Sequence, residues 1–384
     1  MEKHQERFTQ TLGFLNNHDI DPGFRRLLDC VADTQNMTLY QQAIQLTDWK
    51  EEYPDDIDGL IERSKALLLQ TEKHPIMQAN TSAPVVIATD IYKRYKSGVF
   101  TLGPVSVEIK KGQVYGLVGE NGNGKTTLLR ILAKELKENS GNIQYQFSTP
   151  ATDDFELRTK LIYIPQRTKK WYGSLKDNLK LVLSSYQVPP AQNETRVLFM
   201  MARLGLWKYR NLQWHQLSSG YKMRFELART LLRKPELLLL DEPLANLDVL
   251  AQQIILEDLK SIANSITNPI ALILSSQQLY EVEKISDKVI YLKNGQYTDR
   301  DFSAAPETID NLIVEVETRE TRERLLEVLS PLSPEKITYN GGVYIAYFNN
   351  SVLFNDVLAA IGAQCLDITY VRNISNSTRK YFVV

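Results

Sequence analysis

A glycine-rich run that ends in lysine and threonine is the part of the sequence best suited to chemistry. It matches the pattern G-x-x-x-x-G-K-[ST] and consists of Gly119, Glu120, Asn121, Gly122, Asn123, Gly124, Lys125, Thr126 and Thr127. Glycines let several backbone N–H groups converge on one anion, and a helix that starts here adds the positive end of its dipole. The lysine can reach the β- and γ-phosphates of a nucleotide, and the threonine hydroxyl beside it can ligate Mg²⁺. The run predicts a nucleoside triphosphate site, with a glycine-rich surface turn as the alternative.

A pair of carboxylates follows an uninterrupted apolar run. Asp241 and Glu242 come directly after the leucines at 237–240, and such runs are typical of parallel strands that are covered on both faces. At the end of such a strand, Asp241 can hold Mg²⁺ through water and Glu242 can polarise a water molecule that attacks phosphate. Taken without the glycine-rich run, the pair could also be two solvated charges at a strand end.

Strands and helices must lie at fixed places to bring these residues together. From Val85 onward, short β-branched runs alternate with helical segments, which favours an α/β domain. The predicted strands cover 85–87, 114–118, 161–164 and 237–240. The second strand leads into the glycine-rich run and an apolar helix follows at Thr127, which is the arrangement that phosphate binding needs.

The regions on either side of this domain have different patterns. Up to about residue 70, apolar residues recur at helical spacing, with Asp21 as the expected N-cap before Pro22 and Thr38 with Gln41 as an expected capping box. We expect these apolar faces to form a core of their own, with docking onto the rest of the chain or a partner as the alternative. After residue 304 a smaller unit is predicted, with strands at 312–316, 343–348 and 366–371 and helices at 318–329 and 352–361.

Composition excludes several classes of function. The chain has 384 residues and a formal net charge of −1, so it has room for two or three domains, and near-neutrality argues against a dedicated polyanion binder. The charge is uneven, with −6 for residues 1–84, +8 for 85–304 and −3 for 305–384. Four histidines without metal-ligand spacing argue against a histidine-based metal enzyme, and two cysteines cannot make a disulfide framework. With no signal peptide and no apolar run of about 18 to 20 residues, we expect a cytoplasmic chain.

Further short motifs surround these residues in a fixed order. Gln166 follows a predicted strand, the segment Leu217-Ser218-Ser219-Gly220-Tyr221 precedes a helix, and Ala245-Asn246-Leu247-Asp248 follows the acidic pair. Together with the glycine-rich run, these motifs resemble the ATP-binding subunits of ATP-binding-cassette (ABC) transporters over about residues 85 to 295. The resemblance implies ATP and Mg²⁺ as cofactors.

The resemblance also implies a fold class and a division into domains. The expected fold is an α/β P-loop NTPase of ABC type with an inserted helical subdomain, an N-terminal all-α module and a small C-terminal α/β domain. The C-terminal unit resembles, in element order, the domain that follows the cassette in drug- and antibiotic-type exporters. The expected division is a helical module at 1–70, a linker at 71–84, the nucleotide-binding domain at 85–304 with its helical subdomain at about 167–216, and the C-terminal domain at 305–384.

Roles in the site follow from the matching positions. ATP is expected to lie between the phosphate loop of one subunit and the signature and D-loop of a second, which are represented by Ser218, Ser219, Gly220 and Asp248. Tyr95 is expected to stack on adenine, with Tyr92 as the competitor and a core tyrosine as the alternative. The implied Mg²⁺ ligands are Thr126, Gln166 and Asp241. The implied catalytic residues are Glu242, Gln166 and Gln277.

Two departures from the family pattern bear on turnover. Gln277 stands where relatives have a switch histidine, and glutamine can donate a hydrogen bond but carries neither a proton nor a charge. Ser219 and Tyr221 replace a glycine and a glutamine of the signature, and Ser219 adds a side chain where backbone approaches phosphate. We therefore expect slowed hydrolysis rather than its loss.

These observations lead to one expected function and two alternatives. The chain is expected to hydrolyse ATP for a separate transmembrane permease subunit, in an exporter, as a homodimer or a pair of ATPase subunits. The chain would contact the membrane only through this partner. The basic and aromatic segment 167–172 is expected to form the surface on which the partner docks. The other interpretations of this segment are a solvated loop and a nucleic-acid patch. The alternatives are an ATP-responsive regulatory subunit and, less favoured, a soluble ABC protein that acts on ribosomes or nucleic acid.

Overall fold

The computed structural model describes residues 2–79, 83–95, 100–277, 282–301, 311–340 and 342–375. The chain divides into two compact units, one of Met1–Gln277 with Ile290–Asp299 and one of Gln278–Val289 with Arg300–Val384. The expected boundary at 304/305 lies outside the described residues, so the division into domains stays a prediction.

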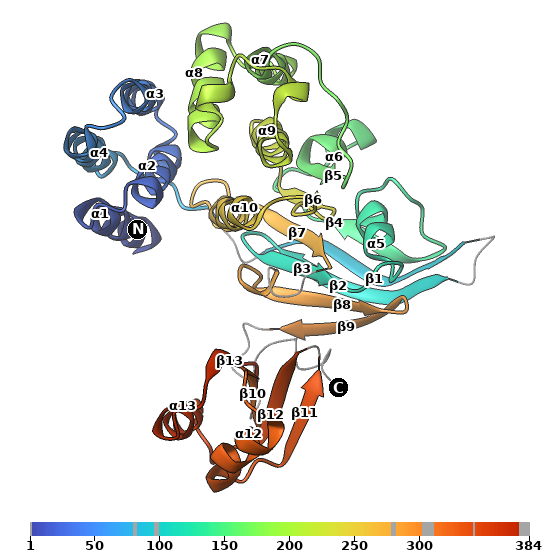
Figure 1. The fold of residues 1–384 in the computed structure, drawn as a ribbon. Helices are drawn as coiled ribbons and strands as arrows, with labels where there is room; N and C mark the ends of the chain where they lie inside the picture. Colours follow the sequence, from blue (N-terminus) through green and yellow to red (C-terminus); the bar gives the residue numbers. More distant parts are fainter. Residues whose placement is uncertain are drawn as a thin grey trace. The chain divides into compact units, whose positions relative to one another are not determined.

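The first unit begins with a group of helices (Figure 1). They are α1 (Glu2–Asn16), α2 (Ile20–Thr34), α3 (Met37–Glu52) and α4 (Ile57–Thr71). Both expected caps are wrong. Asp19 is the N-cap residue of α2, so Pro22 lies within the first turn, where its missing N–H costs nothing. The N-cap of α3 is Asn36, whose side chain accepts from the backbone N–H groups of Thr38 and Leu39.

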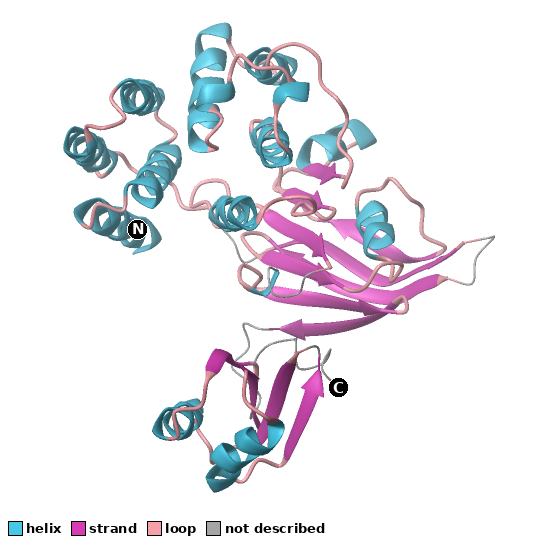
Figure 2. Cartoon of the chain, in the orientation of Figure 1, coloured by secondary structure: helices cyan, strands magenta, loops and turns pink. Residues whose placement is uncertain are grey.

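A largely parallel sheet forms the middle of the first unit (Figures 1 and 2). Among the described residues it has six strands in the order β5-β6-β7-β3-β8-β9, with β5, β6, β7 and β3 paired in parallel. The strands are β3 (Val114–Val118), β5 (Leu161–Ile164), β6 (Leu237–Leu240), β7 (Ala271–Ser276), β8 (Lys288–Lys293) and β9 (Gln296–Asp301). All residues of β3, β6 and β7 are buried, which is expected of strands in a parallel sheet that is covered on both faces. Because Val118 pairs with Ser276 and Leu240 with Leu274, the carboxyl ends of these strands meet at one edge.

A second, antiparallel sheet packs into the same core. Its order is β2-β1-β4, with β1 at Pro84–Arg94, β2 at Thr101–Lys110 and β4 at Ser140–Tyr145. The helices of this region are α5 (Lys125–Leu132), α6 (Asp154–Lys160), α7 (Leu175–Ser185), α8 (Pro190–Arg203), α9 (Ser219–Leu231) and α10 (Val249–Ala263), with 3-10 turns η1 (Trp207–Tyr209) and η2 (Trp214–Gln216). One cluster of buried side chains joins both sheets and α5. The predicted α/β fold with its N-terminal helices is confirmed.

The N-terminal helices share their core with the central region. Their buried side chains form one cluster with Phe199 and Ala202 of α8 and with Trp207 of η1, and the rings of Tyr40 and Phe199 stack with centroids 4.0 Å apart. The helices therefore have a core of their own that also extends onto the rest of the first unit.

A buried carboxylate strengthens this contact. Asp29 of α2 accepts a hydrogen bond from Arg203 Nε of α8 at 2.8 Å and another from the Ser261 hydroxyl of α10. The side chains of Asp29 and Arg203 are only 10% and 13% exposed. One acidic side chain of the N-terminal helices thus links α8 with α10.

The second unit contains an antiparallel sheet with helices packed on it. Its elements are β10 (Asn311–Thr318), α12 (Arg322–Leu329), η3 (Ser330–Leu332), β11 (Lys336–Asn340), β12 (Val343–Asn349), α13 (Phe354–Ala363) and β13 (Ile368–Asn373). The strand order is β11-β12-β10-β13 and every pairing is antiparallel, which is the β-α-β-β-α-β arrangement of ferredoxin-like domains. Apolar residues of α12 and α13 share one core with the sheet (Figure 2). Strand β11 was absent from the sequence-based expectation.

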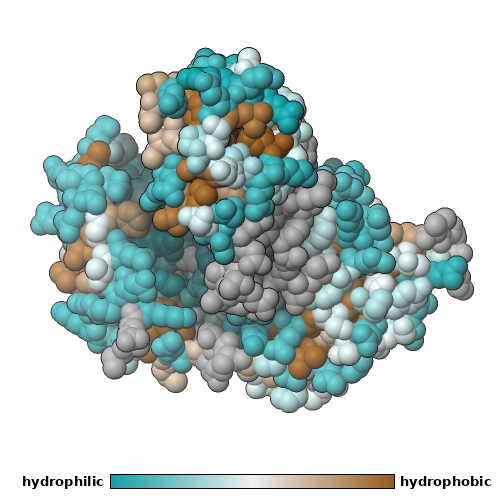
Figure 3. All heavy atoms as spheres, turned by 90° about the horizontal axis from the view of Figure 1, so that it is seen from below, coloured by the Kyte–Doolittle hydropathy of each residue, from teal (hydrophilic) through white to brown (hydrophobic). Residues whose placement is uncertain are grey.

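One face of the structure shows how apolar side chains are distributed on the surface. On the face shown in Figure 3 they form small, separate patches within a mainly hydrophilic surface. Within the described ranges, none of the helices is long and apolar enough to cross a membrane.

Candidate functional site

The glycine-rich run forms the loop between β3 and α5. Gly122 and Gly124 have φ values of 83° and 98°, a region that only glycine adopts readily. A Cβ atom at Gly124 would lie 2.8 Å from the Phe100 ring, so space as well as backbone conformation requires glycine there. The loop therefore ends at the first turn of α5, where unpaired N–H groups face an incoming anion.

Lys125 is held under this loop. Its side chain is 5% exposed, and Nζ donates to the carbonyl oxygens of Gly119 at 2.6 Å and Glu120 at 3.2 Å. Nζ also lies 3.6 Å from Glu242 Oε1. The ammonium group is thus positioned by the backbone of the loop, so a phosphate bound in the loop meets a cation that is already ordered.

Asp241, at the end of β6, lies beside the first turn of α5. Its Oδ2 accepts from Thr126 Oγ1 at 2.8 Å and from the Tyr163 hydroxyl at 3.1 Å, and its Oδ1 accepts from Ser275 Oγ at 2.8 Å. Burial, followed by the charge of Asp241, raises the pKa of Tyr163, which keeps this hydroxyl a hydrogen-bond donor.

These oxygens fit a magnesium ion. Mg²⁺ takes oxygen ligands at about 2.0–2.1 Å in octahedral geometry, so neighbouring ligands lie about 2.9 Å apart. Thr126 Oγ1 and Asp241 Oδ2 are 2.8 Å apart. Among the described residues, no group of three or more His, Cys, Asp or Glu side chains is placed to hold a metal.

Glu242 receives donors from two glutamines. Gln277 Nε2 lies 3.0 and 2.9 Å from its two carboxylate oxygens, and Gln166 Nε2 lies 3.2 Å from Oε2. The backbone N–H of Glu242 donates to Ser275 Oγ at 2.8 Å, and its φ of 47° is in the left-handed region. The structure brings Gln166, Glu242 and Gln277 together, and their catalytic roles stay predictions.

Ser275 and Tyr163 were missed by the sequence analysis. Ser275 Oγ donates to Asp241 and accepts from the backbone N–H of Glu242, so it orients both acidic residues of the pair. Its position at the end of β7, close before Gln277, is a signal that could have identified it. Tyr163 lies in β5, and nothing in its local sequence marks it as a neighbour of Asp241.

Tyr95 lies against the phosphate-loop helix. Its hydroxyl is 3.2 Å from Thr127 Oγ1, and its side chain is partly exposed, at 37%. The Lys93 ammonium lies 5.9 Å from the centre of the ring. Tyr95 is therefore no core residue, which favours it over half-buried Tyr92 for stacking on a base; that role stays a prediction.

The predicted signature lies at the start of α9. Ser218 is the N-cap residue of α9, Ser219 Oγ donates to the carbonyl of Asn246 at 2.9 Å, and Gly220 follows in the first turn. Asp248 caps α10 by accepting from the Ala251 N–H at 2.8 Å. The Ser219 side chain thus bonds to the segment after Glu242, and Ser218, Ser219 and Asp248 are exposed.

The basic and aromatic segment 167–172 is divided between the interior and the surface. Trp171 packs against Phe225, donates from Nε1 to Glu226 at 2.7 Å and lies beneath Arg229. Tyr172 is 88% exposed. Tyr172 is therefore the more exposed of the two aromatic residues, since Trp171 is half-buried.

Comparisons with known proteins agree with this geometry. A family model described as "ABC transporter" matches residues 102–245. The ABC transporter ATP-binding protein NatA of Bacillus subtilis is 28% identical over 224 residues, which cover 55% of this chain and 87% of NatA. The spermidine/putrescine import ATP-binding protein PotA of Mycoplasma mycoides is 30% identical over 206 residues, 54% of this chain and 58% of PotA.

Two further likenesses cover most of the matched protein. Among solved structures, cbiO1 from Clostridium perfringens, part of the ABC transporter complex cbiONQ, has a TM-score of 0.51 and 24% identity, and the match covers 56% of this chain and 87% of cbiO1. The lipopolysaccharide export system ATP-binding protein LptB of Acidithiobacillus ferridurans is 30% identical over 215 residues, 54% of this chain and 86% of LptB. Because the match spans most of LptB and the fold agrees, the chain belongs to the ATP-binding proteins of ABC transporters.

Proposed function

We propose that this chain binds ATP with Mg²⁺ in the phosphate loop and hydrolyses it at Glu242, to power a separate transmembrane subunit. The observation that carries the proposal is the position of the two carboxylates at the end of β6. Asp241 meets the Thr126 hydroxyl at 2.8 Å, while Glu242 lies 3.6 Å from the Lys125 ammonium. The proposed metal ligand Asp241, the proposed base Glu242 and the phosphate-binding Lys125 therefore lie around a single site next to the phosphate loop.

Each residue contributes a separate part of this chemistry. The loop and Lys125 bind and orient the phosphates, and Thr126 with Asp241 and Gln166 would hold Mg²⁺, which neutralises charge on the phosphates when bound. Glu242 is the group that accepts a proton from the attacking water. The amides of Gln166 and Gln277 hold its carboxylate in one orientation, which lowers the entropic cost of placing that water.

Gln277 supports catalysis by orientation only. Its Nε2 donates to Glu242, but an amide cannot carry a proton or a positive charge as a histidine can. Turnover is therefore expected to be slow. This same observation favours a second candidate, an ATP-responsive regulatory subunit in which binding rather than hydrolysis is the signal.

We infer that the site is completed by a second cassette. The signature lies at the start of α9, and its Ser219 Oγ donates to the carbonyl of Asn246 in the D-loop segment. Ser218 and Asp248 are exposed, which leaves them free to meet ATP held by another copy or a paired ATPase subunit. Closure of the pair would exclude water from the site.

The proposal extends to the membrane partner and to the direction of transport. We infer attachment at the inner face of the membrane through a permease subunit, and export as the direction. The element order of the second unit, which resembles that of drug- and antibiotic-type exporters, supports export; the relatives' names include both an export and an import system. Transport assays in inside-out vesicles test the direction, because an exporter accumulates substrate there when ATP is added, and accumulation only in right-side-out vesicles would contradict it.

ATPase assays with a matched variant test the hydrolysis. Steady-state phosphate release is measured for the chain alone and for the complex purified from membranes. Glu242→Gln should reduce release by about 10²- to 10⁴-fold and retain ATP in a stable dimer, whereas Glu52→Gln on the exposed end of α3 should leave both unchanged. Turnover unaffected by Glu242→Gln would refute the assigned base, and ATP binding without turnover in the wild-type complex would favour the regulatory subunit.

A further inference from the structure

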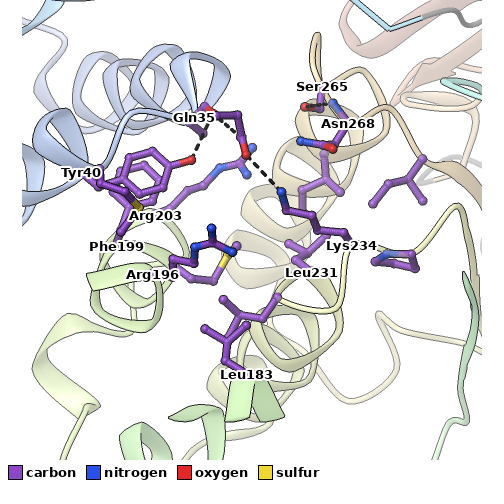
Figure 4. Close-up of a pocket in the computed structure, with 17 residues that line it drawn as sticks. Gln35, Tyr40, Leu183, Arg196, Phe199, Arg203, Leu231, Lys234, Ser265 and Asn268 are labelled. Atoms are coloured by element: carbon purple, nitrogen blue, oxygen red, sulfur yellow. Dashed lines mark hydrogen bonds between the residues drawn. The ribbon is translucent and has the colours of Figure 1, made fainter. Parts of the chain in front are cut away.

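A cavity lies in the first unit where the N-terminal helices meet the central region (Figure 4). Its volume is about 110 Å³, and its walls come from α2 and α3, from α7 and α8, and from the segments that follow α9 and α10. Stacked Tyr40 and Phe199 form one side, and Leu183 and Leu231 line another. The cavity has no residue in common with the phosphate loop.

The charged residues that line the cavity are all basic. They are Arg196, Arg203 and Lys234, and no aspartate or glutamate is among the lining residues. Arg203 is neutralised by Asp29, as described above. The other two cations therefore decide which ligand the cavity favours.

Neither of these two cations pairs with a carboxylate in the described part of the chain. Arg196 donates to the amide oxygen of Gln192 at 2.9 Å, and Lys234 Nζ donates to the amide oxygen of Gln35 at 3.2 Å. Partial burial, followed by repulsion from Arg196, lowers the pKa of Lys234. The close-up shows both side chains directed toward the cavity, with Ser265 and Asn268 across from Lys234 (Figure 4). An anion placed here would relieve the repulsion between the two cations.

We propose that this cavity binds a small organic anion, a carboxylate or a phosphate ester that carries an apolar group. Arg196 and Lys234 would bind the anionic end through charge-assisted hydrogen bonds. The aromatic pair and the leucines would contact the apolar end, and Ser265 and Asn268 offer further hydrogen-bonding groups. Inorganic anions lack the apolar part and should bind more weakly.

The position of the cavity gives such a ligand a regulatory role. Its walls belong to the N-terminal helices, to the helical segment α7–α8 and to the ends of α9 and α10 with the segments that follow them, so one bound molecule lies between all of these parts. A ligand that binds only when these parts are together stabilises that arrangement. This role is separate from nucleotide binding and does not depend on hydrolysis.

Methionine methyl groups offer a local probe of binding. The chain has six methionines, of which Met37 and Met200 line the cavity, whereas Met77 and Met223 do not. The full-length protein carries ¹³C-methyl methionine and is saturated with ADP, which occupies the phosphate loop. Hexanoate and phenyl phosphate are then titrated separately, because they represent the carboxylate and the phosphate ester. The Met37 and Met200 signals should shift saturably with at least one probe, while the Met77 and Met223 signals stay in place.

Substitutions at the two cations complete the test. Arg196→Gln and Lys234→Gln should each weaken binding of the probe by about tenfold or more, since each removes a charge-assisted hydrogen bond. Lys137→Gln, a change of the same charge at an exposed position, should have no effect, and melting temperatures confirm that each variant is folded. The proposal is overturned if neither probe shifts Met37 and Met200, or if both cation variants bind as tightly as the wild type.

Discussion

Replacing Asp29 by asparagine perturbs the contact between the N-terminal helices and the central region at one buried charge. The substitution keeps the size of the side chain and removes the negative charge that Arg203 and Ser261 face. Both side chains of the ion pair are largely buried, at 10% and 13% exposed, so water cannot replace the lost partner. Removal of one member of a buried pair costs about 3–5 kcal/mol. We expect about 3 kcal/mol, because the asparagine oxygen still accepts one hydrogen bond.

Cys30 reports this loss. It is fully buried next to Asp29 on α2, and burial raises the pKa of its thiol to about 12. A thiol reagent therefore reacts only when α2 opens. With Cys365 replaced by serine, Cys30 is the single thiol of the chain. A change of about 3 kcal/mol corresponds to roughly a 150-fold faster labelling rate, at about 1.4 kcal/mol per tenfold.

Two further variants separate charge from packing. Asp21→Asn removes an 84% exposed carboxylate that pairs with Lys50, and surface pairs contribute at most about 1 kcal/mol, so labelling should change by only a few-fold. Asp29→Leu combined with Arg203→Met replaces both partners by apolar groups and should restore much of the protection. Labelling of Asp29→Asn within fivefold of the wild type would refute the reasoning.

The pH dependence of this contribution has a definite sign. Burial opposes the charged form of Asp29, but Arg203, Arg7 and the Ser261 hydrogen bond outweigh it and lower the pKa of Asp29. Its stabilisation is therefore complete above the unfolded pKa of about 3.9 and is lost as the pH falls through the folded value. The excess labelling of Asp29→Asn over the wild type should stay constant above about pH 5 and shrink below about pH 4.

Three other expectations concern the site and a second buried acid. Thr126→Val keeps the shape of the side chain but removes the hydroxyl that donates to Asp241. The affinity for ATP should therefore fall about tenfold in the presence of Mg²⁺ and stay unchanged in its absence. Equal losses of affinity with and without Mg²⁺ would argue against Thr126 as a metal ligand. Gln277→Ala removes two contacts to Glu242 and should lower kcat about tenfold with little change in nucleotide affinity. An unchanged kcat in phosphate-release assays would contradict the orienting role of Gln277. Burial raises the pKa of Asp258 to about 6, above its unfolded value, so the first unit should lose stability as the pH rises from 4 to 6. The excess opening should appear as a pH-dependent increase in Cys30 labelling, and Asp258→Asn should remove that increase. If the increase persists in the variant, another group causes it.

Sequence spacing predicted the phosphate loop well because its chemistry is local. Gly124 and Lys125 are set by backbone conformation within a few residues, and the strand before them and the helix after them are read from hydrophobic pattern. Asp241 could be placed beside Thr126 because the carboxyl ends of parallel strands meet at one edge. The binding and catalytic roles of the phosphate loop, the acidic pair, Tyr95 and the signature residues remain predictions.

Helix caps and short strands were less predictable. Asn36 rather than Thr38 caps α3, because which of several neighbouring polar residues caps a helix depends on the tertiary path of the chain before it. Strand β11 at Lys336–Asn340 is short, and pairing with β12 rather than its own pattern makes it a strand.

The sequence by itself predicted which residues bind triphosphate and Mg²⁺, because glycine conformation, lysine reach and carboxylate position are local or topological properties. Only the tertiary structure decided which distant side chains complete the site. Ser275 and Tyr163 reach Asp241 from two other strands, and the cavity with Arg196 and Lys234 exists because the N-terminal helices pack onto α8. Such long-range contacts depend on how buried surfaces of separate elements fit together, and no spacing within one segment encodes that fit.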